Sequence, residues 1–269
     1  MAILEYTFFQ NAIICSLLAS IACGFVGTYI VARRLVFISG GITHASLGGV
    51  GLGVVAGVNP LYSALAFSVL SALGIQWMSS RNGVREDSAI ALFWTLGMSI
   101  GILCCFLTPG FMPDLQSYLF GSILAIGGAD LVLLAVVAAV TIATFTLLHD
   151  AIVAVGFDAQ FARSQRLPVA VIEYAMMALV AVTVVAVLRM VGIVLALSLL
   201  TVPQMTANLF TVSFRRICLL SIAIGWCGCL CGLALSYSLN VPSGATIIFS
   251  NIVIYAACKA IKSVLCELR

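Results

Sequence analysis

Charged side chains are scarce in this sequence, and their scarcity excludes most classes of soluble protein. Asp, Glu, Lys and Arg make up 8% of the 269 residues, whereas hydrophobic residues make up 63%, and the mean hydropathy is +1.24. A soluble domain of this size needs more surface charge to stay in water. The net charge is +3, and the basic residues are scattered over several short segments between apolar stretches. This distribution is typical of contact with lipid headgroups and argues against a nucleic-acid partner. The chain is therefore predicted to lie in a lipid bilayer.

Lysine is almost absent, and so are the common catalytic motifs. The two lysines, Lys259 and Lys262, do not end a GxxxxGK[ST] motif, so the chain has no Walker A phosphate loop and any ATP-driven step needs a separate ATPase. The sequence also has no HExxH motif, no GxSxG motif and no paired carboxylates at a catalytic spacing. We therefore expect no enzyme activity in this chain and no cofactor bound by it.

What the sequence does contain is a series of apolar stretches of about 20 residues, the length that crosses a bilayer as a helix. These stretches predict an all-α, polytopic helical membrane protein with one transmembrane domain over residues 1–269. We predict nine spans, at 12–32, 37–57, 60–79, 88–108, 130–149, 169–188, 191–211, 217–238 and 245–263. A variant with eight spans, in which one later helix is broken, stays open.

The basic residues give an orientation for these spans. Of the 12 Lys and Arg residues, all but Arg189 lie in or beside alternate gaps between the apolar stretches. Because positive loops stay on the cytoplasmic side, the N-terminus is predicted outside and the basic C-terminal tail inside. The apolar segment Asp114–Gly128 is too short to cross, so we expect a re-entrant or interfacial segment on the extracellular side. Asp114 and Asp130 bracket it and are candidates for attracting an entering cation; solvated loop acids are the alternative.

The longest cytoplasmic gap, His149–Pro168, is semi-polar. Asp158 is suited to cap the N-terminus of a short helix there, and Pro168 to open the next span. A short amphipathic helix on this face would suit docking of a soluble partner, and an ordinary connecting loop is the alternative. Glu173 follows near the start of the next span, where we expect it to contact an arginine or the partner protein.

His44 is the main candidate for chemistry inside the membrane, because ionisable groups at such positions are often functional. Gly40 and Gly48 lie one turn to either side of it on the same face, which predicts room around the imidazole. A neighbouring stripe of small residues predicts close helix packing: Gly41, Ala45, Gly49, Gly53 and Gly57. The alternative is that His44 only forms a hydrogen bond to another helix.

Several motifs in register over nearly the whole chain resemble the permeases of zinc, manganese and iron ABC importers. The first is Val31–Gly53, which looks like the arginine-rich turn and the His-Ala-(Ser/Ala)-(Leu)-x-Gly helix of that family. The others follow in the family's order: Ser117–Ser122, Phe157–Arg163, Val191–Leu195, Leu199–Pro203, Leu235–Tyr237 and Val241–Thr246.

The resemblance implies a fold like that of type II ABC importers and a permease subunit in the bacterial inner membrane. It implies a second copy of the chain, two copies of a cytoplasmic ATPase that uses ATP, and an extracytoplasmic metal-binding protein as partners. By the same resemblance, the passage for a divalent ion contains His44, as a metal ligand, with Gly40, Thr43 and Gly48. The implied coupling segment that docks on the ATPase contains Gly156, Phe157, Asp158, Phe161, Ala162, Arg163 and Arg166.

Two positions depart from the family pattern. Gly40 stands where the family usually has the Asp of a D-x-x-x-H pair, whose side chains share a helix face and can hold one cation. Arg166 stands where the coupling segment commonly has Gly. The missing Asp keeps open a permease for a metal chelate or a haem-like compound. A secondary cation carrier without an ATPase and a non-transporting helical assembly factor are the remaining alternatives.

Overall fold

The structure is a computed structural model that describes residues 7–108 and 126–267, and every regular element within these ranges is a helix. Helices satisfy all their backbone hydrogen bonds internally, as a chain in hydrocarbon must. The all-α prediction is therefore confirmed. The contacts of the chain divide it into two compact units, which we describe separately. The expectation of one domain over residues 1–269 stays a prediction.

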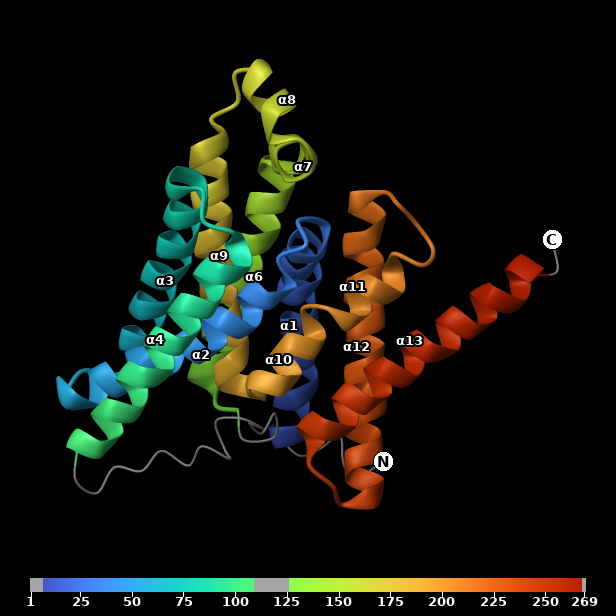
Figure 1. The fold of residues 1–269 in the computed structure, drawn as a ribbon. Coiled ribbons are helices and arrows are strands. Elements are labelled where there is room, and N and C mark those ends of the chain that lie inside the picture. The colour runs from blue at the N-terminus through green and yellow to red at the C-terminus, as the bar shows by residue number, and fades with distance from the viewer. Residues whose placement is uncertain (1–6, 109–125, 268–269) are drawn as a thin grey trace. The chain divides into compact units, whose positions relative to one another are not determined.

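The first unit is built around tight antiparallel pairs of long helices. It contains α1 (Thr7–Ala32), α6 (Gly128–Leu147), α10 (Ile193–Leu199), α11 (Val202–Ala207), α12 (Phe214–Leu239) and α13 (Ser243–Glu267). A methyl group added to Gly24 of α1 would overlap with Ile222 of α12. One added to Gly232 of α12 would overlap with Ile247 of α13. Small residues thus let these backbones meet closely, and Figure 1 shows α11, α12 and α13 side by side.

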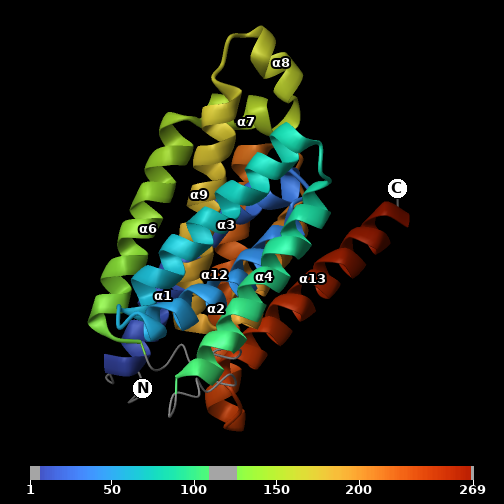
Figure 2. The same cartoon turned by 60° about the vertical axis from the view of Figure 1, so that its left-hand side comes forward.

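The second unit contains α2 (Val36–Val55), α3 (Pro60–Asn82), α4 (Glu86–Leu107), α7 (His149–Phe157), α8 (Ala159–Ser164) and the larger part of α9 (Val169–Val191). Helix α2 packs against both α3 and α4, and Figure 2 shows the same arrangement from a second side. The small residues of α2 make these contacts possible. A methyl group added to Gly49 would lie 2.7 Å from Cα of Ala64 in α3. A methyl group added to Gly41 would lie 2.5 Å from Cγ2 of Ile90 in α4. The close packing predicted from the small-residue stripe is confirmed for Gly41, Ala45, Gly49 and Gly53, which divide between two neighbouring helices. It is wrong for Gly57, which follows the end of α2 and where a methyl group would meet no atom within 4 Å.

In the described ranges, eight helices are long and apolar enough to cross a membrane. They correspond to eight of the nine predicted spans, with ends that differ by a few residues. The predicted span at 191–211 is the exception, because it is formed by the two short helices α10 and α11. One later helix is thus broken, and the number of membrane crossings stays a prediction.

Pro203 explains the break between α10 and α11. In a continuous helix the carbonyl of Leu199 would accept a hydrogen bond from the N–H of residue 203, and proline has none. The side chain of Gln204 replaces the missing donor: its Nε2 donates to Leu199 O at 3.1 Å and to Cys23 O of α1 at 2.7 Å. The hydroxyl of Thr201 donates to Leu197 O at 2.8 Å. Side chains therefore satisfy carbonyls that the interrupted helix leaves free.

Candidate functional site

His44 lies in the middle of α2 with its ring against Trp94 of α4. The two rings are stacked, with centroids 4.5 Å apart and planes within 9° of each other, and both residues are half-buried. The pairing follows from the close contact of α2 with α4: Gly97, one turn after Trp94, lies so near Ala45 that a methyl group on it would overlap with Ala45 Cα. The indole covers one face of the imidazole. The ring nitrogens lie at the edge of an imidazole, and in the neutral ring the lone pair of the unprotonated nitrogen points outward in the ring plane.

The expected room beside His44 is absent on the side of Gly48. A methyl group on Gly48 would lie 2.6 Å from Gly97 O, so the backbone of α4 fills this side. The physical reason is that Gly48 and Gly97 face each other. Two facing glycines let the helix backbones touch, so no space remains between them. Gly40 is buried in α2, and the hydroxyl of Thr43 donates to Ser39 O one turn earlier at 2.6 Å. The expectation of room around the imidazole is therefore wrong on the side of Gly48, and the place of Gly40, Thr43 and Gly48 in the passage stays a prediction.

A complete metal-ligand set does not form within the described ranges. These residues contain no group of three or more His, Cys, Asp or Glu side chains that could hold a metal ion. Asp114 lies outside the described residues, as does most of the predicted re-entrant segment Asp114–Gly128. Asp130 lies in the first turn of α6, where its Oδ2 accepts from Gly127 N at 3.4 Å. An acidic group suits this position, because the N-terminal end of a helix is electropositive.

The predicted coupling segment is a corner made of α7 and α8. Asp158 ends α7 in an extended conformation, and its Oδ1 accepts from the N–H groups of Gln160 and Phe161 at 3.0 and 2.9 Å. The predicted N-cap is therefore confirmed. Two aromatic side chains project from the corner, Phe157 with 66% and Phe161 with 56% of its surface exposed. Of the other coupling residues, Ala162 is buried, Gly156 half-buried, and Arg163 and Arg166 exposed.

Arg166 has the backbone conformation that explains why glycine is common at this position in the family it resembles. Its φ of 60° lies in the left-handed region, which costs energy for any residue with a Cβ. The N–H of Arg166 donates to Arg163 O at 3.0 Å, and that of Leu167 donates to Ala162 O at 3.1 Å. These two bonds form the Schellman motif that ends a helix, with Arg166 at the position where glycine is preferred.

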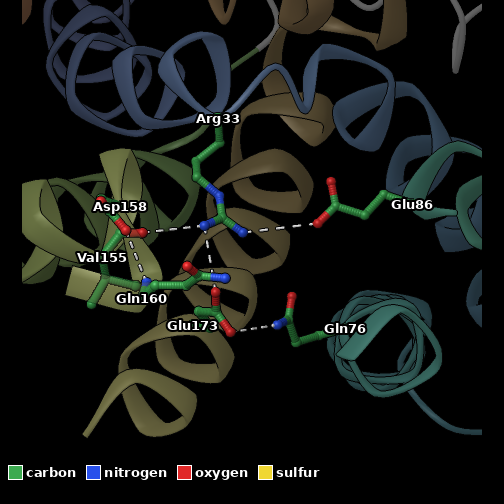
Figure 3. Close-up of polar contacts among 7 residues, drawn as sticks. All are labelled: Arg33, Gln76, Glu86, Val155, Asp158, Gln160 and Glu173. Carbon is green, nitrogen blue, oxygen red and sulfur yellow. Dashed lines mark hydrogen bonds and ion pairs between the residues drawn. The ribbon is translucent and has the colours of Figure 1, made fainter. Parts of the chain in front are cut away.

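A charged cluster in the second unit is centred on Arg33 (Figure 3). Its Nη1 donates to Val155 O in α7 at 3.2 Å and to Glu173 Oε1 in α9 at 3.4 Å, and its Nη2 lies 3.8 Å from Glu86 Oε1 in α4. Glu173 Oε2 accepts from Gln76 Nε2 of α3 at 3.0 Å. The expectation that Glu173 contacts an arginine is confirmed. We define these five residues, Arg33, Gln76, Glu86, Val155 and Glu173, as the Arg33 cluster.

Sequence reasoning missed the cluster as a whole. Arg33 and Glu173 are 140 positions apart, and Gln76 and Glu173 are 97 apart, so no local pattern connects them. The available signal was the placement of Arg33, Glu86 and Glu173 at span ends that were all predicted to lie on one side of the membrane. The Gln204 contact was also missed. Its signal was Pro203 inside an apolar run, which breaks a helix.

Comparison with known proteins identifies the family. Residues 5–262 match a family described as "ABC 3 transport family", which is nearly the full length of the chain. The chain belongs to the ABC 3 transport family. The resemblance recognised from the motifs is therefore confirmed.

Several proteins similar in sequence to this chain are named for metal transport. The chain is 33% identical to a "Probable metal transport system membrane protein" of Chlamydia muridarum, over 90% of this chain and 86% of that protein. It is 28% identical to "Manganese transport system membrane protein MntC" of Listeria monocytogenes, over 94% and 90% of the two chains. Among solved structures it resembles PsaBC from Streptococcus pneumoniae in complex with Fab, with 27% identity, a TM-score of 0.83, and coverage of 94% and 91%.

Proposed function

We propose that this chain is the permease subunit of an ABC importer that carries a divalent transition metal ion into the cytoplasm. The relatives named for metal and manganese transport support the cargo class, and membership of the family supports ABC transport. The observation that carries the proposal is the exposed corner of α7 and α8. A corner that is capped within the chain and presents Phe157 and Phe161 outward is suited to insert into a groove of a soluble ATPase.

The orientation we propose places the N-terminus outside and the C-terminus in the cytoplasm. In the first unit, α1 runs antiparallel to α12, because Gly24 contacts Ile222 while the earlier Ser20 contacts the later Gly225. Helix α12 likewise runs antiparallel to α13, because Gly228 contacts Asn251 and Gly232 contacts Ile247. Lys262 Nζ donates to Leu209 O, so the tail lies near the loop before Arg215 and Arg216. In the second unit, Arg33 lies beside the first turns of α4 and α9. Within each unit, basic gaps thus gather at one end, which agrees with the positive-inside rule.

We propose His44 as a ligand that the metal ion meets during passage. Trp94 covers a face of the imidazole and leaves the ring edge for coordination. Since Gly40 supplies no carboxylate on the same helix face, we expect the other ligands to come from a second copy of the chain or from water. A lone neutral imidazole binds weakly, and a weak site lets the ion leave again. An extracytoplasmic binding protein would deliver the ion, and ATP hydrolysis by the partner would drive the passage.

Reconstitution tests this function. The permease is purified with its ATPase and placed in liposomes, and ATP hydrolysis and metal uptake are measured for zinc, manganese and iron. We expect at least one of these ions, delivered with its binding protein, to stimulate hydrolysis and enter the liposomes. Wild-type liposomes that take up none of the three, under conditions where the complex hydrolyses ATP, would reject the proposal.

Two variants then separate ligation from packing at His44. His44→Ala is expected to reduce uptake about 10-fold or more, because a coordinating nitrogen is lost. His44→Gln retains a planar polar group of similar size but is a poor ligand for these ions, so it should resemble the alanine variant. Wild-type uptake by His44→Gln would remove His44 from the passage and leave it a packing role.

A further inference from the structure

The side chain of Arg33 occupies a position that is unusual for a residue in a connecting turn. It lies between the end of α1 and the start of α2, yet only 16% of its side chain is exposed, and the side chain of its partner Glu173 is 12% exposed. Arg33 therefore points into the protein, as Figure 3 shows. A charge in such a place is retained at a cost in desolvation, so its interactions must be specific.

The Arg33 guanidinium closes the end of α7. This helix stops at Phe157, so its last carbonyls have no intrahelical donor. Ala154 O accepts from Asp158 N at 3.0 Å, and Val155 O accepts from Arg33 Nη1 at 3.2 Å. A cation is favourable here, because the C-terminal end of a helix is electronegative. The corner of α7 and α8 is thus held on one side by Arg33 and on the other by the Asp158 cap.

The same guanidinium reaches two more helices. Nη1 also donates to Glu173 of α9, and Nη2 is paired with Glu86 of α4. Through its second oxygen Glu173 accepts from Gln76 of α3. A planar fork with five N–H donors can serve several acceptors at once, and an ammonium group on a flexible stem does so poorly. One side chain therefore joins α7, α9 and α4 directly, and α3 through Glu173.

Helix α2 begins two residues after Arg34, and it carries His44. It is packed without space against α4 at Gly48 and Gly97 and against α3 at Gly49 and Ala64. Interfaces this close transmit displacement, because interiors have low compressibility. A shift of α7 and α8 that is passed to α4 through Arg33 would therefore move the His44–Trp94 pair with α2 and α4.

From these contacts we propose that Arg33 is the positioning residue that transmits movement of the α7–α8 corner to the helices that hold His44. The inference rests on the proposed function, in which an ATPase binds this corner. Arg33 contacts neither the ion nor the ATPase in this role. It converts a movement of the corner into a movement of α4 and α9, which share its guanidinium with α7, and of α2, which packs against α4.

A purely structural role for Arg33 makes a different prediction. If the cluster only stabilised the fold, its loss would lower the amount of assembled transporter, and ATP hydrolysis and uptake would fall in the same proportion. A positioning role predicts that hydrolysis continues while transport falls. The deciding quantity is therefore the number of metal ions taken up per ATP hydrolysed by assembled complex.

The experiment compares Arg33→Gln, Arg33→Lys and Arg34→Gln with the wild type in liposomes that contain the full transporter. Arg34 is the matched control, because it has the same charge in the same turn, is exposed, and takes no part in the Arg33 cluster. We expect Arg33→Gln to bind the ATPase and keep hydrolysis within about twofold of wild type, while uptake per ATP falls 10-fold or more. Arg33→Lys should be intermediate, and Arg34→Gln should match wild type.

Three results would overturn the proposal. The first is a wild-type number of metal ions taken up per ATP hydrolysed in Arg33→Gln. The second is an equal loss of uptake per ATP in Arg33→Gln and Arg34→Gln. The third is a fall of ATP hydrolysis in Arg33→Gln in the same proportion as uptake. If Arg33→Gln does not fold, Glu173→Gln replaces it, since the amide retains an acceptor but loses the charge. Uptake per ATP hydrolysed should then fall several-fold in Glu173→Gln, and a wild-type value would overturn the proposal. The wild-type arm reports on the proposed function independently: without metal-dependent uptake there, that function fails whatever the variants do.

Discussion

The imidazole of His44 lies flat on the indole of Trp94, with 4.5 Å between the ring centroids. The stack restricts rotation of the imidazole, because turning the ring out of plane would push it into the indole. A ligand whose orientation is fixed in advance loses less conformational freedom when it binds an ion. Trp94 therefore determines the direction in which the His44 nitrogens point.

Trp94→Ala is predicted to weaken metal uptake without removing the ligand. With the indole gone, the imidazole samples several rotamers, and we expect the concentration of metal that gives half-maximal uptake to rise about 3- to 10-fold. Trp94→Phe keeps an aromatic face and should lie between the alanine variant and wild type. Trp77→Ala on α3 is the control, since this tryptophan is 49% exposed. Identical uptake curves for Trp94→Ala and Trp77→Ala would contradict the orienting role.

Gly97→Ala is predicted to destabilise the second unit. The added methyl group would overlap with Ala45 Cα, so α2 and α4 would have to move apart, and overpacking of this kind costs about 1–3 kcal/mol. We expect a lower temperature of unfolding in detergent, measured by intrinsic fluorescence. Gly128→Ala is the matched control, because a methyl group there meets no atom within 4 Å. An unfolding temperature for Gly97→Ala equal to that of the control would show that the contact is not tight.

Asp158→Ala is predicted to loosen α8. The variant removes the oxygen that accepts from two backbone N–H groups, and loss of such a cap costs about 0.5–2 kcal/mol. Amide hydrogen exchange at residues 159–164 should become faster, and less ATPase should co-purify. Asp158→Asn retains a side-chain oxygen that caps helices equally well, so it should behave as wild type. If the asparagine variant also lost the ATPase, the charge and not the cap would be responsible.

Arg166→Gly is predicted to stabilise the corner, and Arg163→Gly to destabilise it. Arg166 adopts a left-handed conformation that glycine reaches freely, so the first change should slow amide exchange in α8 by a factor that corresponds to about 1 kcal/mol. Arg163 lies within α8, where glycine costs about 1 kcal/mol. The two changes remove the same charge from the same segment, so their opposite signs would isolate the backbone effect. Equal effects would assign the change to the lost charge.

The sequence was sufficient for features that depend on local pattern. The long helices follow from apolar length, because a chain in lipid can satisfy its backbone only within each segment. The α8 cap follows from Asp158, whose oxygen bonds to N–H groups two and three residues later. Close packing of α2 follows from the spacing of its small residues.

Features that depend on the neighbouring helix could not be predicted from the sequence. Room around His44 was inferred from the glycines of α2 alone, and the structure fills that space with Trp94 and Gly97 of α4. Glu173 was expected to meet an arginine, but nothing in the sequence distinguished Arg33 from the other basic residues. Residues 191–211 have the apolar length of one span, but Pro203 has no N–H to donate to the carbonyl of Leu199, so they form two short helices.

The way Gln204 replaces the missing donor has a consequence for how this chain can bend. Bending a continuous helix sharply breaks backbone hydrogen bonds, and in hydrocarbon no water replaces them. At the junction of α10 and α11 side chains supply part of the bonding: the amide of Gln204 donates to Leu199 O and the hydroxyl of Thr201 to Leu197 O, beside the backbone bond from Thr201 N to Ser198 O. Two of the carbonyls at this junction therefore depend on side chains that can change rotamer, so bending here breaks fewer backbone hydrogen bonds than bending a continuous helix would, and the α10–α11 junction is the natural hinge of this segment.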